Sequence, residues 1–497
     1  MLAKTVSFTV DGTAVRPVEV EVDVCRGLPS FGLVGLPDTA VREARERVRS
    51  AMENSGFDFP LRRITASLAP ADLRKNGPGF DLALAGALSI AAGEVPPDRL
   101  EGWGLVGELA LDGSVRPVRG ALAMAEGARE AGLRGILVAT ANGPEAALAE
   151  GILVRTIDGL SELRATTEEG PPGKAAVPME LGIHPDREGP DLADLRGQPG
   201  LRRALEVSAA GAHGLLMIGP PGAGKSLAAR RLPSILPGLA REEALEVARI
   251  GGICGTLAPD VTRPFRAPHH TVTRAGLIGG GLPPRPGEIT LAHRGVLFLD
   301  ELPEFRREVL EALREPLEAG RVEISRANGH YSMPARFVLV AAANPCPCGR
   351  GDSDPGCNCS RAAIDRYSHA LSGALADRID MTVSVAQPGF ESMRGPAGEG
   401  SGEVRERVES ARRRMEGRLG PGRANGDATR EETSGFSVTK GALSLLGEAT
   451  RTRRLSGRGH DRVLRLGRTL ADLGGRKSIA EEDVAVALQL RSREGAG

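Results

Sequence analysis

A glycine-rich stretch near the middle of the chain has the residue types needed to bind phosphate. The sequence LLMIGPPGAGKSLAARRL begins at residue 215, and Gly219, Gly224, Lys225 and Ser226 fit the pattern G-x-x-x-x-G-K-[ST]. In such a loop, backbone N–H groups surround the β-phosphate, the lysine meets the β- and γ-phosphates, and the hydroxyl binds Mg²⁺. We therefore predict that this loop binds ATP. The other residues of this predicted ATP-binding loop are Pro220, Pro221, Gly222 and Ala223.

Two adjacent acidic residues follow a second apolar run. The sequence GVLFLDEL predicts a strand that ends at Asp300 and Glu301. In a P-loop NTPase, an acid at this place holds the Mg²⁺ shell, which we expect of Asp300. The neighbouring Glu301 could then act as the general base that polarises the attacking water.

An asparagine ends a third apolar run. The sequence RFVLVAAANP predicts a strand that stops at Asn344, directly before Pro345. A neutral amide there can orient the attacking water and sense the γ-phosphate. The alternative is a turn-forming asparagine. Together with the two earlier motifs, the position favours the sensor role.

Four of the six cysteines follow within fourteen positions. Cys346, Cys348, Cys357 and Cys359 have the spacing C-x-C-x8-C-x-C. Four thiolates can close a tetrahedral Zn²⁺ site, which is the prediction here. Incidental reduced thiols are the alternative, and a redox role would need a poised pair near a nucleophile.

Length and composition indicate a soluble chain of several domains. The 497 residues are 41% hydrophobic, and 64 basic residues balance 64 acidic ones, so any nucleic-acid partner must bind a local basic patch. The first residues alternate like a strand and lack the layout of a signal peptide. No apolar run approaches the roughly 20 residues that span a bilayer. We expect a cytoplasmic protein with no membrane partner.

Composition also divides the chain into segments. Residues 1–165 mix short strands with Ala-rich helices, and residues 166–190 are rich in Pro, Gly and Glu, as in a linker. Residues 191–395 alternate apolar strands with helices, which predicts an α/β core that positions the phosphate loop and both later motifs. Residues 396–497 are predicted to be a helical lid.

Longer strings resemble a known family. FRAPHHTVTRAGLIGGG, PRPGEITLAHRGVLFLDELPEF, AAANPCPCG and SGALADRIDM are similar to the YifB/ComM family of magnesium-chelatase-like AAA+ ATPases. The resemblance extends to FGLVGLPDTAVREARERVRSAMENSGFDFP near the start and LSGRGHDRVLRLGRTLADL near the end. It implies a multidomain α/β fold with a Lon-protease-like N-terminal domain, an AAA+ P-loop core and a C-terminal helical lid. It also implies a homo-oligomeric ring, a hexamer, with ATP bound between subunits.

Two arginines gain roles from this resemblance. The family's DR[IF]D arginine matches Arg378, which would reach into the neighbouring site as an arginine finger. The lid arginine matches Arg462 in GHDRVLRL and would act in cis, on the nucleotide of its own subunit. From the residues alone, either could be an ordinary solvated arginine.

The first domain resembles the proteolytic domain of Lon, which uses a Ser–Lys dyad. Gly79 stands where Lon carries its serine, and Leu122 stands where Lon carries its lysine. Without a hydroxyl nucleophile and a base, acyl transfer has no route. We therefore expect no protease activity and a structural or substrate-engaging role.

A predicted β-hairpin bears on what the ATPase acts on. The sequence GRVEISRANGHYSMPARFVLV predicts two strands around the turn Asn328–Gly329. In related ring helicases such a hairpin projects into the pore, which would place Arg326, His330 and Tyr331 near a threaded strand. Arg326 could then contact phosphate without reading sequence.

The favoured partner is DNA, branched or single-stranded, because ComM-type relatives drive branch migration during recombination in natural transformation. The alternative is a chelatase motor that drives insertion of magnesium into a porphyrin. The chain has no D-x-S-x-S metal-adhesion sequence. The chelatase motor also lacks a Lon-like domain. Both observations favour the DNA motor.

Overall fold

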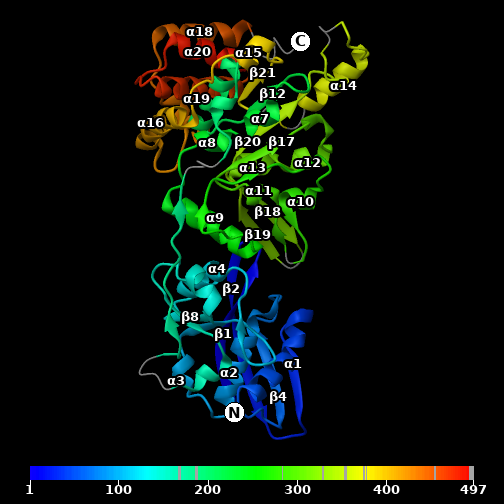
Figure 1. The fold of residues 1–497 in the computed structure, drawn as a ribbon, viewed down its shortest axis with the longest axis vertical. Helices are drawn as coiled ribbons and strands as arrows, with labels where there is room; N and C mark the ends of the chain where they lie inside the picture. The colour runs from blue at the N-terminus through cyan, green and yellow to red at the C-terminus, as the bar shows by residue number, and fades with distance from the viewer. Residues whose placement is uncertain are drawn as a thin grey trace.

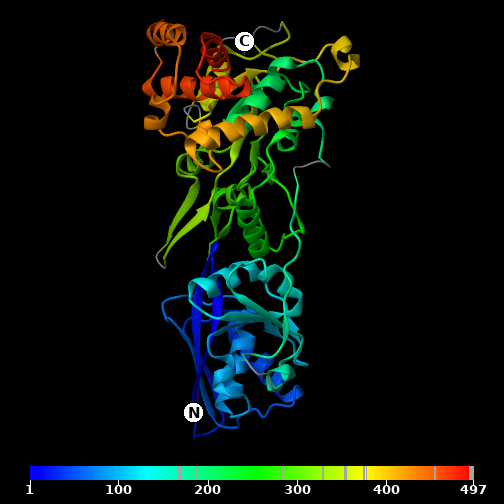
Figure 2. The same ribbon diagram turned by 90° about the vertical axis from the view of Figure 1, so that its left-hand side faces the viewer.

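The molecule is elongated, with the phosphate-loop domain in its middle. The computed structural model describes residues 1–165, 170–184, 189–282, 284–326, 329–351, 355–372, 375, 378–452 and 455–491. The N-terminal domain lies at one end and the C-terminal helices lie at the other (Figures 1 and 2). Parts of the expected linker, residues 166–169 and 185–188, are outside the described residues. None of the described helices combines the length and the apolar character needed to cross a membrane.

The N-terminal domain is built on one mixed eight-stranded sheet. Its strand order is β10-β9-β8-β5-β1-β2-β4-β3. Its strands are β1 (Leu2–Asp11), β2 (Ala14–Cys25), β3 (Ser30–Val34), β4 (Arg63–Ala69), β5 (Trp103–Val106), β8 (Gly135–Ala139), β9 (Leu153–Ile157) and β10 (Lys174–Ala175), and β6 (Glu108–Leu109) pairs with β7 (Val115–Arg116) outside it. Its helices are α1 (Thr39–Asn54), α2 (Asp81–Ala91), α3 (Pro97–Leu100), α4 (Ala121–Glu130) and α5 (Gly143–Ala146). All residues of α2 are buried, which agrees with its mostly apolar sequence, and its first residue, Asp81, accepts a hydrogen bond from Arg47 Nε at 2.7 Å.

The phosphate-loop domain contains a five-stranded parallel sheet. Its order is β14-β17-β20-β12-β21, with strands β12 (Leu215–Ile218), β14 (Phe265–Arg266), β17 (Val296–Leu299), β20 (Val338–Ala343) and β21 (Met381–Ser384). Two hydrophobic clusters cover its two faces, so β12, β17 and β20 are buried throughout and their sequences are continuously apolar. Because the strands are parallel, the residues that follow β12, β17 and β20 meet at one edge of the sheet.

Short helices and strands surround this sheet. The helices are α6 (Pro199–Gly211), α7 (Lys225–Ala229), α8 (Leu232–Ile235), α9 (Arg241–Cys254), α10 (Arg274–Ile278), α11 (Glu288–Leu291), α12 (Arg307–Ala312), α13 (Arg314–Ala319) and α14 (Arg361–Ser372). The strands are β11 (Gly182–Ile183), β13 (Asp260–Val261), β15 (Gly279–Gly280), β16 (Arg285–Pro286), β18 (Arg321–Arg326) and β19 (Gly329–Pro334). In Figure 1, α14 lies at the outer edge of the domain.

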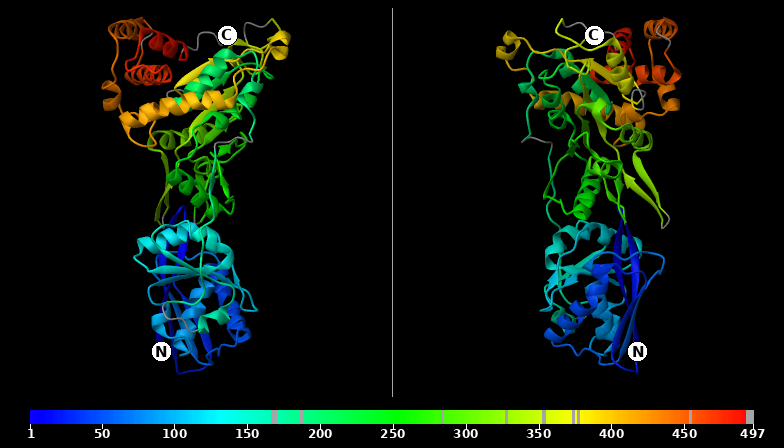
Figure 3. Two further views of the ribbon diagram at one scale, coloured as in Figure 1. Left: turned by 60° about the vertical axis from the view of Figure 1, so that its left-hand side comes forward. Right: turned by 90° about the vertical axis from the view of Figure 1, so that its right-hand side faces the viewer.

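The C-terminal region is helical. Its helices are α15 (Phe390–Arg394), α16 (Ser401–Leu419), α17 (Arg430–Ser434), α18 (Lys440–Thr452), α19 (Gly457–Leu473) and α20 (Glu481–Gln489). Figure 3 shows them at the end of the molecule opposite the N-terminal domain, with α16 crossing the phosphate-loop domain. Val404 and Val408 of α16 belong to the same hydrophobic cluster as Leu205 of α6, so the lid and the core share buried packing.

The N-terminal domain is docked on α9. One buried cluster joins Phe8 and Ala125 of the N-terminal domain to Ala244 and Ala248 of α9. Two ion pairs also cross the boundary: Arg241 Nη2 lies 2.8 Å from Glu150 Oε1, and Arg249 Nη1 lies 3.5 Å from Glu126 Oε2. Because buried apolar contact supplies most of the stabilisation between packed elements, the two domains are expected to move together.

The N-terminal domain packs so closely on α9 that adding one methyl group to this helix should disturb the contact. A Cβ at Gly252 of α9 would lie 2.3 Å from Glu145 Oε1, and that oxygen accepts a hydrogen bond from Leu122 N at the start of α4. We expect Gly252→Ala to push Glu145 away and to destabilise the protein by about 1–3 kcal/mol, measured as a lower thermal midpoint.

A glycine with open space serves as the control for that substitution. A Cβ at Gly417 in α16 would meet nothing within 4 Å, so Gly417→Ala should be neutral or stabilise by up to about 1 kcal/mol. Equal midpoints for the two variants would contradict the close docking of α4 on α9.

Candidate active site

The phosphate loop joins the end of β12 to α7. Its Gly222 and Gly224 have φ of +79° and +88°, which glycine adopts without steric cost. A Cβ at Gly219 would lie 2.1 Å from the carbonyl oxygen of Val385, so a larger residue there would separate the loop from the chain after β21. Space beside Gly222 is open. The sequence therefore needs glycine at these positions for backbone curvature and for close approach.

Lys225 and Asn344 are brought together at this loop. Lys225 is 8% exposed, and its Nζ donates to Gly219 O at 2.6 Å, to Pro220 O at 2.9 Å and to Asn344 Oδ1 at 3.1 Å. Burial lowers the pKa of Lys225, and the carboxylates of Asp300 and Glu301 oppose that shift. The ammonium group is therefore positioned on the inner side of the loop, and it touches the side chain predicted to be the sensor.

Ser226 and Asp300 form the second contact within the site. Ser226 Oγ donates to Asp300 Oδ2 at 2.6 Å, and the other carboxylate oxygen of Asp300 accepts from Glu301 N at 3.0 Å. Hydroxyl and carboxylate oxygens are the hard ligands that Mg²⁺ prefers, so this pair fits the ion that the phosphate loop implies. A cavity of about 340 Å³ is lined by the loop, Asp300, Glu301 and Asn344, which is within the range of small-molecule sites.

Glu301 is held in an unusual backbone conformation beside a histidine. Its φ is +53°, a left-handed value that costs energy for a residue with a Cβ. Its Oε2 lies 3.2 Å from His270 Nδ1, and the His270 ring packs 4.1 Å from the ring of His269 and edge-on to Phe305. Sequence reasoning did not find the contact between His270 and Glu301. The string APHHT marks the histidines, but nothing local indicates that one of them meets the acid after β17.

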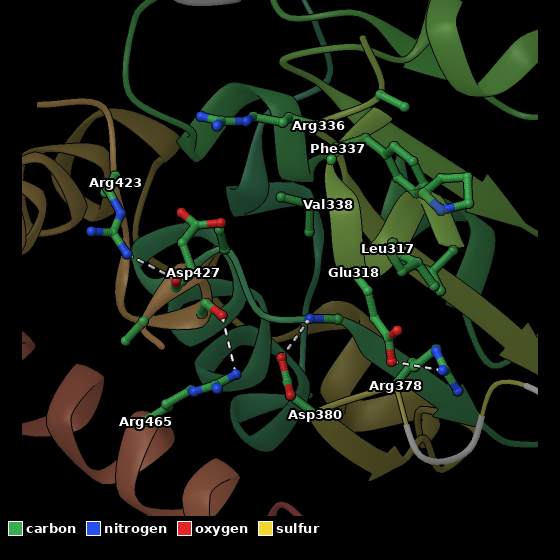
Figure 4. Close-up of a pocket in the computed structure, with 18 of the residues that line it drawn as sticks. Leu317, Glu318, Arg336, Phe337, Val338, Arg378, Asp380, Arg423, Asp427 and Arg465 are labelled. Atoms are coloured by element: carbon green, nitrogen blue, oxygen red, sulfur yellow. Dashed lines mark hydrogen bonds and ion pairs between the residues drawn. The ribbon is translucent and has the colours of Figure 1, made fainter. Parts of the chain in front are cut away.

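A second, larger cavity contains both predicted arginines. It has a volume of about 630 Å³ and lies between the core and the lid (Figure 4). Nine arginines and five acidic residues line it. The arginines are Arg263, Arg294, Arg336, Arg378, Arg412, Arg423, Arg458, Arg462 and Arg465. This excess of positive charge suits an anionic ligand.

Each of the two predicted arginines lies next to a carboxylate. Arg378 Nη2 lies 2.7 Å from Glu318 Oε1, and its buried Nε has no hydrogen-bond partner among the described residues (Figure 4). Arg462 Nε lies 3.4 Å from Asp380 Oδ1. Asp380 in turn accepts a hydrogen bond from Gly214 N, directly before β12.

The structure does not bring Arg462 to its own phosphate loop. Through Asp380, Arg462 is tied to the start of β12, whereas the phosphate loop follows the end of that strand. A four-residue strand is about 13 Å long. No arginine lines the phosphate-loop cavity among the residues described there. The expected action of Arg462 in cis is therefore unsupported, since it shares the cavity of Arg378.

The four cysteines form a single cluster. Their sulfur atoms all lie within 4.8 Å of one another, and Cys346 is fully buried. Cys346 Sγ lies 3.3 Å from Cys348 Sγ and 3.8 Å from Cys357 Sγ, distances too long for disulfides. The backbone N–H of Arg350 lowers the pKa of Cys348 to about 6. The pKa values of the neighbouring Cys357 and Cys359 are raised instead, so the placement of the four sulfur atoms, and not the ionisation of one thiol, supports a metal site.

The predicted hairpin is present as β18 and β19. Arg326 pairs with Gly329 and Ile324 pairs with Tyr331, while the predicted turn residue Asn328 lies outside the described residues. Arg326 is exposed, and His330 is 64% exposed with Nε2 2.6 Å from Glu323 Oε2.

The placement expected for Tyr331 was wrong. Tyr331 is 8% exposed, because its ring packs into the core of the domain and under the β1–β2 turn. A Cβ at Gly12 in that turn would lie 3.1 Å from Met333 Cε, and Thr13 Oγ1 donates to Ser332 O at 3.5 Å. Figure 2 shows the tip of this N-terminal hairpin next to the phosphate-loop domain.

The Lon-like positions lie in apolar surroundings. A Cβ at Gly79 would be 3.7 Å from methyl groups of Val106 and Val118, and Leu122 is fully buried. A side chain at position 79 would therefore meet aliphatic groups. The lack of protease activity stays a prediction.

Three family models match successive parts of the chain. The model described as magnesium chelatase, subunit ChlI, matches residues 191–393. A second model, subunit ChlI of Mg-chelatase, matches residues 20–142, and the model of the ChlI C-terminal region matches residues 398–491.

Several known proteins match over almost the whole length. An uncharacterised protein of Mycobacterium tuberculosis is 44% identical, covering 99% of this chain and 98% of its own. The uncharacterised protein YifB of Escherichia coli is 40% identical over 97% of this chain and 95% of its own, and the competence protein ComM of Haemophilus influenzae is 39% identical over 97% and 96%.

A shorter match connects the chain to chelatases. The magnesium-chelatase 38 kDa subunit of Rhodobacter capsulatus is 27% identical over 39% of this chain and 55% of its own. The proteins YifB and ComM therefore match nearly the whole chain, whereas the chelatase subunit matches only part of it.

Proposed function

The chain belongs to the YifB/ComM family of magnesium-chelatase-like AAA+ ATPases, and from this premise we propose that it is an ATP-hydrolysing ring motor that acts on DNA. One observation carries the ATPase part. Lys225, Ser226, Asp300, Glu301 and Asn344 converge on one cavity at the carboxyl ends of β12, β17 and β20. These are the groups that bind a triphosphate and activate water.

Each residue has a defined part in the proposed hydrolysis. The loop N–H groups and Lys225 bind the β- and γ-phosphates, and Ser226 with Asp300 would hold Mg²⁺, which neutralises phosphate charge when bound. Glu301 accepts a proton from the attacking water, and Asn344 orients that water toward the γ-phosphorus. The bond to ADP breaks as the bond to water forms, which yields ADP and inorganic phosphate.

The arginine cavity supports action between subunits. Arg378 and Arg462 lie together and away from their own phosphate loop, so a neighbouring subunit's nucleotide is the phosphate that they could reach in a ring. A head-to-tail ring places this face of one subunit against the phosphate loop of the next. We propose a hexamer, as the family resemblance implies, and both arginines as groups that act in trans.

The DNA part of the proposal has two supports. The H. influenzae relative is named a competence protein, and the family resemblance implies a role in branch migration. Arg326 at the end of β18 and Gly329 and His330 at the start of β19 are exposed, so Arg326 could meet a phosphate backbone. Such contacts bind without reading sequence. We place this activity in the cytoplasm, on branched or single-stranded DNA, during recombination or transformation.

The proposal is tested by the effect of DNA on ATP turnover. We expect four-way junctions to raise the rate of phosphate release and to be converted to exchanged products in the presence of ATP. If DNA leaves turnover unchanged and a porphyrin-binding partner protein raises it, the chain is a chelatase-type motor instead.

Arg326 provides a more specific test of the hairpin. Arg326→Ala should lower DNA-stimulated turnover about 3- to 10-fold and reduce the salt dependence of DNA binding, because one phosphate contact is lost. Arg307→Ala, at an arginine 89% exposed on α12, is the matched control and should retain stimulation. Equal stimulation in both variants would argue against contact between the hairpin and DNA.

The cysteine cluster completes the proposed set of cofactors. We propose that Cys346, Cys348, Cys357 and Cys359 hold one structural Zn²⁺, in addition to the Mg²⁺ that accompanies ATP.

A further inference from the structure

The cysteine loop lies against the nucleotide site. Gly349, between the two cysteine pairs, has φ of +87°, and a Cβ there would lie 2.8 Å from Pro221 Cδ and 4.0 Å from Asn344 Cγ. The backbone of the cysteine loop is therefore packed on a proline of the phosphate loop. Cys346 follows Asn344 by two residues, so the same loop also continues directly from the predicted sensor.

The sulfur atoms of the four cysteines are close enough to be ligands of one metal ion, with all of them within 4.8 Å of one another. Thiolates around tetrahedral Zn²⁺ have Zn–S distances of about 2.3 Å, which places the sulfur atoms about 3.8 Å apart. The three sulfur separations among Cys346, Cys348 and Cys357 are 3.3, 3.6 and 3.8 Å. Gly351 N also donates to Cys346 Sγ at 3.2 Å, the kind of outer contact that orients a thiolate ligand.

A second element ties the cluster to the catalytic groups. Helix α14 begins two residues after Cys359, and its Tyr367 Oη accepts a hydrogen bond from Asn344 N at 3.3 Å. The same helix packs against residues 302–304, which directly follow Glu301. Tyr367 is half-buried in the hydrophobic cluster of this face.

We propose that Zn²⁺ bound by the four cysteines is a clamp that aligns the sensor and the general base for ATP hydrolysis. The metal joins the end of β20, through Cys346 and Cys348, to the start of α14, through Cys357 and Cys359. The loop closed in this way packs against Pro221, and the helix that follows it places Tyr367 Oη within hydrogen-bond distance of Asn344 N. The described residues that line the nucleotide cavity include no cysteine. The role of this clamp rests on the proposed ATPase function. The rate of ATP hydrolysis would then depend on a metal ion that takes no part in the reaction.

The expected effect is on turnover more than on ATP affinity. The phosphate loop keeps its own glycines, Lys225 and Ser226 when the metal is lost, so nucleotide binding should change by less than about threefold. The water-orienting groups lose their support, and small displacements of such groups reduce rates by 10- to 100-fold.

The experiment compares cysteines inside and outside the cluster. Full-length protein purified without chelator is assayed for zinc by mass spectrometry, for fluorescent-nucleotide binding and for phosphate release. We expect about one zinc per chain in the wild type and in Cys25→Ser, whose exposed thiol lies at the end of β2. Cys346→Ser and Cys359→Ser should lose the zinc and show a turnover number at least tenfold lower.

Tyr367→Phe separates the clamp from simple loss of folding. It should retain zinc and the wild-type thermal midpoint, and lower the turnover number about three- to tenfold, because Asn344 N loses its acceptor. Cobalt substituted for zinc should give the intense visible absorption of tetrahedral thiolate coordination in the wild type and not in Cys359→Ser.

Each result decides one claim. Wild-type protein without zinc and without cobalt absorption would overturn the metal site. Zinc that is lost from Cys346→Ser with turnover unchanged would overturn the clamp and leave a merely structural metal. A wild-type chain that binds zinc and never hydrolyses ATP, with or without DNA, would overturn the proposed function and leave the metal site standing.

Discussion

Replacing Glu301 by glutamine is expected to lower the ATP turnover number at least 100-fold while ATP affinity stays within about threefold. General base catalysis contributes factors of about 10²–10⁴, and an amide cannot accept the proton from water. Glutamine has nearly the same size as glutamate and keeps a side-chain oxygen that can contact His270 Nδ1. Lys225, proposed to bind the phosphates, and Ser226, proposed to hold Mg²⁺, make hydrogen bonds to other groups and not to the Glu301 side chain among the described residues. Phosphate release and fluorescent-nucleotide binding measure the two quantities separately.

Neighbouring acids provide the controls for Glu301. Glu308→Gln changes a carboxylate that is 64% exposed on α12 and should leave turnover unchanged. Asp300→Asn should weaken Mg²⁺-dependent nucleotide binding as well as turnover, because Asp300 contacts Ser226. Glu301→Ala should also bind ATP without hydrolysing it. Normal turnover in Glu301→Gln would assign the base to another residue.

Replacing Arg378 by alanine is expected to lower turnover by about 10³-fold, the effect of removing an arginine finger. The basis is its placement in the arginine cavity, with an unpartnered buried Nε and a carboxylate partner, Glu318, that is 57% exposed. Arg378 itself is only 10% exposed, but its partner Glu318 is on the solvent side, where a phosphate could take its place. Arg314→Ala, at an exposed arginine of α13, is the control and should remain active.

Mixing two inactive variants tests whether Arg378 acts across subunits. Arg378→Ala retains an intact phosphate loop and Glu301, whereas Glu301→Gln retains an intact Arg378. In randomly mixed head-to-tail rings, about one interface in four combines the two intact halves, so activity should return to roughly a quarter of wild type. A mixture that stays inactive, although mixed rings form, would show that Arg378 acts within its own chain.

The same experiment applies to Arg462. Because Arg462 and Arg378 share one cavity, Arg462→Ala should also be complemented by Glu301→Gln in mixed rings. Complementation of one arginine and not the other would separate their roles.

The residues of the nucleotide site could be predicted because their contacts follow from local sequence and one general rule. The phosphate loop is a continuous segment whose glycines and lysine have fixed spacing. Asp300 and Asn344 each follow a continuously apolar strand, and parallel strands bring such positions to a common edge. The cysteines could be grouped in the same way, since a short loop limits the separation of their sulfur atoms. The family assignment, made from long strings, is confirmed by full-length relatives.

The sequence by itself determined which side chains gather at the proposed nucleotide site, because their positions depend on short-range order along the chain. Only the tertiary structure decided that His270 meets Glu301, that Arg462 lies with Arg378 and away from its own phosphate loop, and that Tyr331 is buried. The tertiary structure also decided that the cysteine loop packs against Pro221 of the phosphate loop. Each of these contacts joins segments far apart in the sequence, and their geometry depends on how whole elements pack, which no local pattern of residue types records.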